Sequence, residues 1–404
     1  MRYLFERFLH AAYIAIARIA AKLLPDRIPV TFAGSDAVAE LCASIGHQGV
    51  RRALVVSDAG LVEIGIVGRI TEELTEAGVE WTVYSEVEPD PTFPQVETGL
   101  QVYEAEGCDA VVGVGGGSSM DAAKMIAALA TNGGPLSKLE GKLRVRKAPA
   151  PLFAVPTTAG TGSEVTVAAV VSDAETHEKK FFLDPKLLPD MAALDPGLTT
   201  GLPAPITAAT GMDALTHAVE SFVSRASTKQ TKDYAKMAVR LIFENLPKAF
   251  ADGSDLAARQ GMLLASYYAG LAFTRSSLGN VHAIAHNLGA AYGTPHGLAN
   301  ATALPHVLDF SKDDAQEQLA RLAEVIGLSG DSDVEKAQQF IDAVRDLMAT
   351  LEIPYELEAL QNEDITSIAR RARAEAFLDY PVPRFMSQSE CEGLLQQMCP
   401  SRAA

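Results

Sequence analysis

The hydrophobic pattern of this chain changes near residue 203, and that change limits the available folds more than any other feature. Before this point, short apolar runs of strand length alternate with stretches of helical periodicity. The clearest strand-like runs are Arg52–Asp58, Trp81–Tyr84, Ala110–Val114 and Pro151–Pro156. Strands that alternate with helices predict a parallel sheet covered by helices on both faces. We therefore predict a Rossmann-like α/β domain over residues 29–203.

After residue 203 the strand-like runs stop, while helical periodicity continues into the C-terminal region. The clearest helical stretches are Lys232–Phe250, Leu256–Phe273 and Asp313–Ile326. A helix with this pattern buries one apolar stripe against its neighbours. The second half, residues 204–404, is accordingly predicted to be an all-helical domain.

Composition and charge exclude several classes of partner. The 404 residues are 48% hydrophobic and 21% charged, which is ordinary for a soluble protein with two domains. A formal net charge of -17 without a long basic run argues against nucleic acid and against an anionic membrane surface as partners. The four cysteines, scattered without metal or redox spacing, predict free thiols in a reducing compartment, the cytoplasm.

Residues 1–28 form a separate segment with the pattern of an amphipathic helix. Apolar side chains from Phe5 to Leu23 recur at steps of three and four and define one helical face. Arg7 and Arg18 interrupt the segment, so it lacks the apolar core of a signal peptide and the ~20 uncharged residues of a spanning helix. We expect its apolar face to pack on the same subunit or in a homodimer or higher homo-oligomer, rather than on a membrane.

One aspartate and four histidines form a pattern that indicates a metal site. Asp213 precedes His217 by four residues, His282 precedes His286 by four, and His296 follows ten residues later. Residues four apart share a helical face, so each pair can direct two side chains at one point. An uncompensated charge in these apolar surroundings would be costly. Imidazoles and a carboxylate without thiolate suit Fe(II), Zn(II) or a neighbouring ion, and core or capping histidines are the alternative.

A glycine-rich turn follows the strand-like run at 110–114 and opens a helical stretch, Ser118–Thr131. Its glycines allow positive φ and a close approach of a ligand to the backbone. The helix N-terminus that follows offers free amides and a partial positive charge to a phosphate. Serine replaces the third glycine of the G-x-G-x-x-G pattern, and a tight strand–helix corner is the alternative interpretation.

Two further features favour a dinucleotide at this turn. The next strand-like run ends in a hydroxyl-rich loop, Pro156–Ser163, which can hydrogen-bond a pyrophosphate or a ribose. Asp58 ends an earlier run, where an acid can bond the adenosine ribose hydroxyls and repel a 2′-phosphate. We therefore expect NAD, with NADP less favoured. A simple turn aspartate is the alternative for Asp58.

Together these residues resemble the iron-containing (group III) alcohol dehydrogenase family from about residue 30 to the C-terminal region. The most specific segments are Gly115–Ser118, Pro156–Thr166, Gly211–Glu220 and Gly279–Asn300. The resemblance implies a dehydroquinate-synthase-like architecture, with a dinucleotide-binding α/β domain, a helical domain, and the cofactor and metal in the cleft between them. It also implies an NAD-linked enzyme that interconverts a primary alcohol and its aldehyde, with Fe(II) expected and Zn(II) as the rival metal.

The resemblance assigns roles residue by residue. The metal ligands that it implies are Asp213, His217, His282 and His296. His286 matches the family's histidine near the nicotinamide and substrate, often assigned to proton relay. The cofactor-binding positions are Asp58, Gly115, Gly116, Gly117, Ser118, Thr157, Thr158, Thr161 and Lys180. Arg275 and Ser276 are expected either to admit a polar or acidic substrate or to face solvent.

In this scheme the nicotinamide carries the hydride, the metal polarises the substrate oxygen, and His286 passes the proton to solvent. A dehydroquinate-synthase-like lyase is one alternative, but it needs convergent Lys or Arg residues, and Gly279–Asn300 contains neither. A polyol- or glycerol-dehydrogenase-like enzyme of the same superfamily is another. A non-catalytic metal- or nucleotide-binding protein is disfavoured because the ligand pattern and the phosphate turn occur together.

Overall fold

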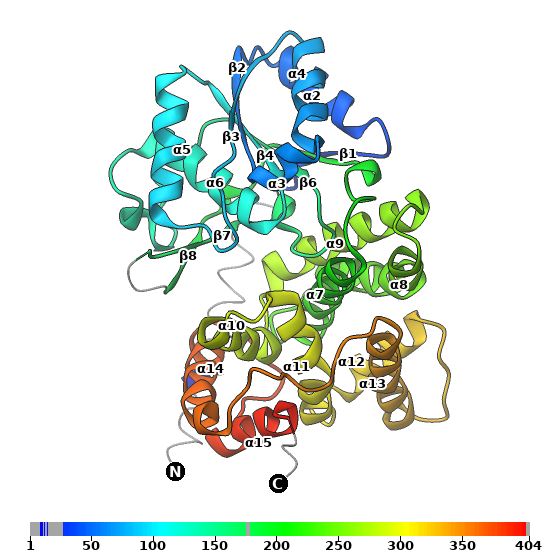
Figure 1. Cartoon of the computed structure of the whole chain (residues 1–404). Coiled ribbons are helices and arrows are strands. Elements are labelled where there is room, and N and C mark those ends of the chain that lie inside the picture. The colour runs from blue at the N-terminus through cyan, green and yellow to red at the C-terminus, as the bar shows by residue number, and fades with distance from the viewer. Residues whose placement is uncertain (1–8, 11, 13, 15–26, 175–177, 401–404) are drawn as a thin grey trace. The chain divides into compact units, whose positions relative to one another are not determined.

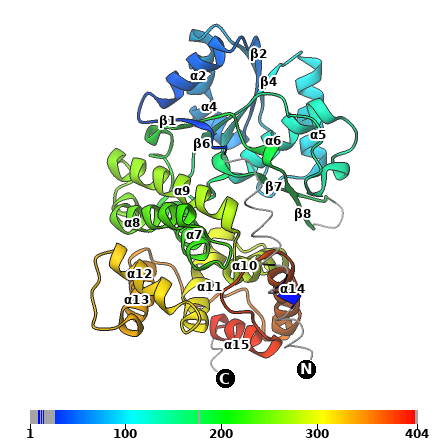
Figure 2. The ribbon, with the colours of Figure 1, turned by 180° about the vertical axis from the view of Figure 1, so that it is seen from behind.

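The computed structural model describes residues 9, 10, 12, 14, 27–174 and 178–400 of the chain (Figure 1). These residues divide into two compact units, which Figure 2 shows from behind. The α/β unit comprises residues 27–202 together with Ser254–Leu263. The helical unit comprises Pro203–Gly253 and residues 264–400, with the described residues of the N-terminal segment.

A parallel six-stranded sheet forms the centre of the α/β unit. Its strand order is β1-β9-β6-β4-β2-β3, and every neighbouring pair runs parallel. The strands are β1 (Val30–Ala33), β2 (Arg52–Val56), β3 (Glu80–Tyr84), β4 (Ala110–Gly115), β6 (Leu152–Pro156) and β9 (Met191–Leu194). The four strand-like runs of the sequence are β2, β3, β4 and β6, so the predicted α/β fold class is confirmed.

Helices cover both faces of this sheet because its central strands are apolar on both sides. Leu54 and Val56 of β2 pack into one core with α5 (Phe93–Ala105) and α6 (Gly117–Asn132). Ala53 and Val55, which point the other way, pack into a second core. The helices of that second core are α2 (Ala37–His47) and α4 (Ile66–Glu76). Figure 1 shows the two helix layers.

A second, three-stranded sheet in the α/β unit was not predicted from the sequence. It contains β5 (Gly141–Lys142), β8 (Lys179–Leu183) and β7 (Ala168–Ser172) in that order. β7 and β8 pair antiparallel, whereas β5 and β8 pair parallel. β5 has only two residues and β8 begins with two lysines, so neither carries the apolar run of a buried strand. β7 does carry such a run, Ala168–Val171, which the sequence analysis did not single out.

A buried lysine ties α6 to the loop after β6. Lys124 is 1% exposed, and its Nζ donates to Ser163 Oγ (2.8 Å), Thr166 Oγ1 (2.9 Å) and the carbonyl of Ala168 (2.7 Å). Burial lowers the pKa of Lys124 to about 8. Burial also raises the pKa of the nearby Glu164 carboxyl to about 7. The helix of the glycine turn and the hydroxyl-rich loop are therefore held together by a charged group inside the unit.

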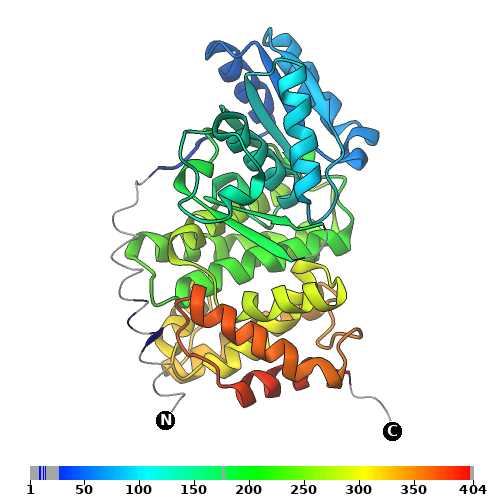
Figure 3. The ribbon, with the colours of Figure 1, turned by 90° about the vertical axis from the view of Figure 1, so that its left-hand side faces the viewer.

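Nine α-helices make up the helical unit over the described residues after Leu202. They are α7 (Ala204–Val223), α8 (Lys229–Ala251), α9 (Leu256–Ser276), α10 (Asn280–Tyr292), α11 (His296–Ser311), α12 (Gln316–Val325), α13 (Asp333–Thr350), α14 (Ile365–Asp379) and α15 (Gln388–Met398). The first part of α9, up to Leu263, belongs to the α/β unit. The three predicted helical stretches correspond to α8, α9 and α12. α7 is buried on almost every side and packs on α8 and α11. α14 lies between α10 and α15, as Figures 1 and 3 show.

Part of the predicted N-terminal amphipathic helix falls within the described residues. His10 and Ile14 are helical and buried. The Nδ1 of His10 lies 3.1 Å from the carbonyl oxygen of Phe377, and its ring packs against Phe377 and Phe385. His10 and Ile14 therefore pack on the same subunit, whereas Leu9 and Ala12 are helical and exposed. The other residues of the predicted helix lie outside the described residues. Among the helices described, none combines the length and apolar character needed to cross a membrane.

The cysteines agree with the expectation of free thiols. Cys42, Cys108, Cys391 and Cys399 are all unpaired and buried. Burial raises the pKa of the Cys42 thiol to about 12, and it raises that of Cys391 to a similar value. Such thiols are inert in folded proteins, so we assign no chemistry to them.

Glu164 provides a test of the buried network. Its folded-state pKa of about 7 lies above the ordinary value of 4.5, so folding favours its protonated form. The stability that this group contributes is therefore complete below its unfolded pKa and is lost as pH rises through its folded pKa. We expect the melting temperature of Glu164→Gln to rise relative to that of the wild type as the pH increases from about 5 to about 8. Glu97→Gln, at an exposed position on α5, is the control. A difference in melting temperature that does not change with pH would contradict this assignment.

Candidate metal centre and cofactor turn

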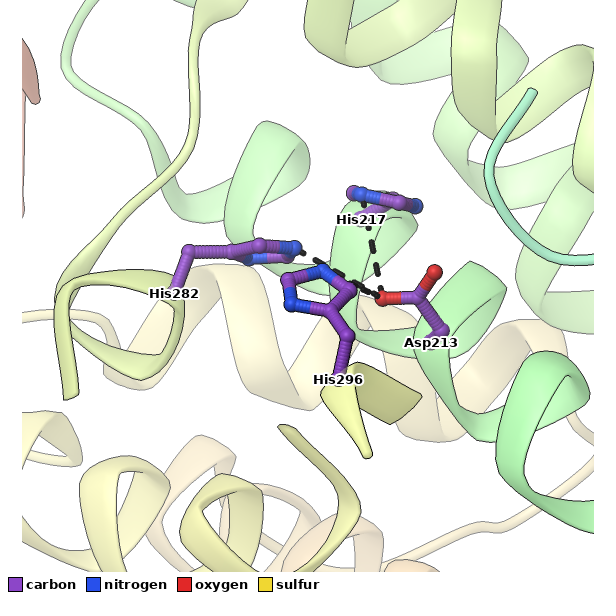
Figure 4. Close-up of side chains that lie close together, drawn as sticks. All are labelled: Asp213, His217, His282 and His296. Atoms are coloured by element: carbon purple, nitrogen blue, oxygen red, sulfur yellow. Dashed lines mark ion pairs between the residues drawn. The ribbon is translucent and has the colours of Figure 1, made fainter. Parts of the chain in front are cut away.

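Four side chains from three helices of the helical unit meet at one point (Figure 4). Asp213 and His217 lie one turn apart on α7, His282 lies on α10, and His296 begins α11. The Oδ1 of Asp213 lies 3.9 Å from Nε2 of His217, 3.7 Å from Nε2 of His282 and 3.4 Å from Nε2 of His296. One potential ligand atom from each residue lies within 4.8 Å of all the others. The fold thus brings together the four residues that the resemblance named as ligands.

Close packing of α11 on α7 makes this convergence possible. A Cβ atom at Gly297, the residue after His296, would lie 2.3 Å from the carbonyl oxygen of Ala209 on α7. Only glycine fits at this position without a backbone shift. The missing side chain therefore lets the first turn of α11 approach α7 closely enough for His296 to reach Asp213.

The electrostatics of the cluster fit a divalent cation. Burial alone would raise the pKa of the Asp213 carboxyl, but the imidazoles of His217, His296 and His282 hold it well below its usual range. Burial opposes the charged form of His282, yet the carboxylates of Asp213 and Glu220 raise its pKa to about 9. A metal ion bound at these atoms would replace that proton and compensate the buried carboxylate. Three imidazole nitrogens and one carboxylate oxygen suit Fe(II) or Zn(II).

Glu220 is a second buried acid that the sequence analysis did not single out. Its Oε2 lies 2.6 Å from Nδ1 of His282 and accepts from the amide of Gly279 at 2.9 Å. Its Oε1 accepts from the amide of Val281 at 2.7 Å. The carboxylate therefore fixes the ring of His282 and the N-terminus of α10 together, which leaves Nε2 for the cluster. Glu220 follows Asp213 by two helical turns on α7, and this spacing was the available signal.

Asn300 is a further buried partner of the cluster. It follows His296 by one turn of α11, and its Nδ2 donates to Oδ1 of Asp213 at 2.7 Å. The same nitrogen lies 3.0 Å from Nε2 of His296 and 3.2 Å from Nε2 of His282. Asn300 thus holds the Asp213 carboxylate in orientation. The sequence analysis missed it because an asparagine on an apolar helix carries no distinctive spacing by itself.

His286 lies beside the cluster rather than in it. Its ring stacks on the ring of His296 with centroids 5.2 Å apart and planes 17° apart. Its Nδ1 lies 2.6 Å from Oε1 of Glu375 on α14. His282 and His286 share one face of α10, as their spacing predicted, but each is held by a different carboxylate.

Ser276 does not face solvent. The side chain is fully buried, and its Oγ lies 2.6 Å from Oγ of Ser221 and donates to the carbonyl of Ala272 at 2.7 Å. The expectation that Ser276 faces solvent is therefore wrong, and a role of this residue in admitting a polar substrate stays a prediction. A hydroxyl at the end of α9 can satisfy itself inside the protein, and sequence spacing could not distinguish that from exposure.

The glycine turn and the hydroxyl-rich loop lie against each other in the α/β unit. Gly115 ends β4 with φ of 146°, and a Cβ there would lie 2.5 Å from Oγ of Ser119. The amide of Thr157 donates to the carbonyl of Gly115 at 3.0 Å. A Cβ at Gly117, beside Ser118 in the first turn of α6, would lie 3.0 Å from Cγ2 of Thr161. Similarly, a Cβ at Gly116 would lie 3.3 Å from Oγ1 of Thr158.

Asp58 and Lys180 lie in different settings. Asp58 follows β2, the neighbour of β4, and its carboxylate caps the short helix α3 (Ala59–Glu63) by accepting from the amide of Leu61 at 2.9 Å. Leu61 in turn approaches the Gly115 position. Lys180 lies on β8, where its ammonium pairs with Glu178 at 2.8 Å. That ion pair lends no support to the cofactor contact implied for Lys180 by the resemblance.

The chain combines an α/β unit that carries a glycine turn with a helical unit that carries a cluster of potential metal ligands. This organisation is typical of a metal-dependent dehydrogenase. Residues 29–196 match the family described as iron-containing alcohol dehydrogenase, and residues 207–399 match the C-terminal part of the same family. The chain belongs to the iron-containing alcohol dehydrogenase family and is an alcohol–aldehyde oxidoreductase.

Similar proteins of known activity extend this assignment. The chain is 39% identical to the NAD-dependent methanol dehydrogenase of Bacillus methanolicus over 348 residues, which cover 85% of this chain and 91% of the relative. It is 42% identical to the 1,3-propanediol dehydrogenase of Klebsiella pneumoniae over 335 residues, which cover 82% and 87%. A crystal structure of a 1,3-propanediol oxidoreductase superposes with a TM-score of 0.89 at 38% identity, covering 92% of this chain and 98% of that one.

Glu220→Gln tests the support of the metal centre. The amide keeps the size of the side chain but cannot accept from His282 and two backbone amides at once. Loss of such a carboxylate partner weakens metal binding by roughly 10- to 100-fold. We expect that loss in a chelator-competition titration with Zn(II), with unchanged circular dichroism. Glu244→Gln, at an exposed position on α8, should bind like the wild type. Wild-type affinity in Glu220→Gln would show that the contact does not support the metal site.

Proposed function

We propose that this enzyme interconverts small primary alcohols and their aldehydes, with a divalent metal held by Asp213, His217, His282 and His296. The convergence of four ligand atoms within 4.8 Å of one another carries the proposal. Fe(II) is favoured over Zn(II) on family membership, since imidazole and carboxylate suit both ions. When bound, the metal supplies Lewis acidity toward the substrate oxygen. Four protein ligands would leave a position for the substrate oxygen on an ion that takes five or six ligands.

NAD is the proposed hydride carrier, bound through the cofactor positions named above. Gly115, Gly116, Gly117 and Ser118 would take the pyrophosphate, because they join β4 to the N-terminus of α6 and the glycines have no side chain to keep a phosphate away. Thr157, Thr158 and Thr161 line the adjoining loop and would donate hydroxyls. Asp58 would hydrogen-bond the adenosine ribose. Lys180 is the remaining proposed cofactor-binding residue, and its assignment rests on the family resemblance alone. The name of the NAD-dependent methanol dehydrogenase supports NAD as the cofactor.

His286 is the proposed proton relay. Oxidation of an alcohol removes a hydride from carbon and a proton from oxygen, and the nicotinamide takes only the hydride. An imidazole exchanges protons near neutral pH and can pass this proton to solvent. Stacking of His286 on His296 keeps the ring beside the ligand cluster, and its side chain is 16% exposed, so water can reach it.

The substrate class follows from the names of two relatives, which act on methanol and on 1,3-propanediol. We infer a small unbranched alcohol or diol. The dehydroquinate-synthase-like alternative gains no support from these relatives, whereas the diol named for one of them is compatible with the polyol-dehydrogenase-like alternative. The four free buried thiols suit a reducing compartment, so we infer a cytoplasmic enzyme. A homodimer or higher homo-oligomer remains a prediction.

The decisive experiment combines activity with metal analysis. The protein purified anaerobically is assayed with NAD and a panel of primary alcohols, diols and branched alcohols, and its metal is measured by mass spectrometry. We expect NADH formation with short primary alcohols and about one metal ion per chain. His282→Ala should lose both the metal and at least 100-fold in kcat/KM, as the loss of a catalytic group does. His47→Ala, an exposed histidine on α2, should keep both. A fully metallated and active His282→Ala enzyme would contradict the ligand assignment.

Asp58→Asn isolates the charge of Asp58 from its capping role. Asparagine also accepts from a helix amide, so α3 keeps its cap while the negative charge disappears. A unit charge a few ångströms from a 2′-phosphate costs on the order of 1–4 kcal/mol, so the NAD/NADP ratio of kcat/KM should fall roughly tenfold or more. Asp36→Asn, on the loop after β1, provides the control. An unchanged ratio in Asp58→Asn would leave Asp58 as a turn residue only.

A further inference from the structure

Glu375 on α14 gathers three hydrogen-bond donors at one carboxylate. Its Oε1 lies 2.6 Å from Nδ1 of His286 and accepts from the hydroxyl of Tyr380 at 2.7 Å. Its Oε2 accepts from Nδ2 of Asn287 at 3.1 Å. His286 and Asn287 are consecutive residues of α10, so one carboxylate on α14 hydrogen-bonds two side chains in the middle of that helix.

The groups around Glu375 are themselves fixed. Asn287 cannot reverse its amide, because Nδ2 also donates to the carbonyl of Ala283 (2.9 Å) and Oδ1 accepts from Nε of Arg371 (3.0 Å). Tyr380 is buried, and burial followed by the charge of Glu375 raises its pKa well above the usual range. Tyr380 therefore stays a donor and cannot compete for the proton of His286. Every neighbour orients the carboxylate toward Nδ1.

We propose that Glu375 is the positioning residue of His286, an inference that rests on the relay role proposed above. The carboxylate accepts a hydrogen bond from Nδ1–H, so the neutral ring carries its lone pair on Nε2 and is held nearly parallel to the ring of His296. NAD, when bound, would take the hydride from the alcohol carbon, and Nε2 of His286 would accept the hydroxyl proton. The imidazolium that results is stabilised by Glu375 until Nε2 releases the proton to water.

A carboxylate is better suited to this task than a neutral acceptor. It stabilises the charged ring that exists only while the proton is in transit, whereas an amide would hold the ring without that charge. The ligand histidine of the same helix, His282, has its own carboxylate in Glu220. α10 thus presents two carboxylate-bound histidines four residues apart, one among the metal ligands and one beside them.

Glu375→Gln is the principal variant. The amide replaces one acceptor oxygen with a donor, so it cannot satisfy His286, Tyr380 and Asn287 together, and it carries no charge. We expect kcat for alcohol oxidation to fall about 10- to 100-fold, while KM for the alcohol, the dissociation constant for NAD and the metal content stay within about twofold. Glu375→Asp keeps the charge on a shorter stem and should recover part of kcat. Tyr380→Phe keeps the carboxylate contact and should lose less than Glu375→Gln.

Tyr292→Phe is the matched control. The Tyr292 hydroxyl donates to the carboxylate of Asp364 at 2.7 Å, and this bond also joins α10 to the start of α14, but far along α10 from His286. Its loss should leave kcat unchanged. If Tyr292→Phe slows turnover as much as Glu375→Gln does, the effect is a loosening of α14 on α10, and the proposal is overturned.

A double-mutant cycle separates positioning from structural support. If Glu375 acts through His286, adding Glu375→Gln to His286→Ala should slow kcat no further than His286→Ala alone. Additive losses would overturn the proposal. A fully active Glu375→Gln enzyme beside a slow His286→Ala enzyme would overturn the positioning role and keep the relay. Wild-type kcat in His286→Ala would instead refute the relay proposed above.

Discussion

A carboxylate buried among apolar helices must be compensated, and the helical unit is organised around the compensation of Asp213. Removing such a charge from water costs several kcal/mol unless hydrogen bonds and opposite charges replace the lost hydration. Imidazoles from three helices and the amide of Asn300 surround Asp213. The packing of α7, α10 and α11 is therefore tied to one polar point.

Carboxylate partners also determine which ring nitrogen of two histidines is available. An imidazole has two nitrogens, and the partner of one determines the proton state of the other. Glu220 and Glu375 each take Nδ1 of one histidine on α10, so that Nε2 is the nitrogen left for chemistry. His282 directs Nε2 toward Asp213, whereas His286 stacks beside the cluster. Two histidines on one helical face are therefore held in different settings.

The cofactor turn depends on a different physical constraint, the absence of side chains. The glycines after β4 let α6 begin directly against the hydroxyl-rich loop, and Lys124 ties the helix and the loop together from inside. Membership of the iron-containing alcohol dehydrogenase family joins these two kinds of site in one enzyme.

Local backbone geometry explains which features of the fold and the site could be predicted from the sequence alone. Helical periodicity placed Asp213 with His217 and His282 with His286, and apolar runs separated by helices predicted four neighbouring strands of the sheet and the α/β class. The resemblance, not spacing, separated His286 from the ligands. Tertiary structure alone paired Glu220 with His282, and Glu375 with a residue 89 positions away. It also buried Ser276 and formed the small sheet. Periodicity depends on dihedral angles within a few residues, whereas such contacts depend on how whole helices pack, which no single segment encodes.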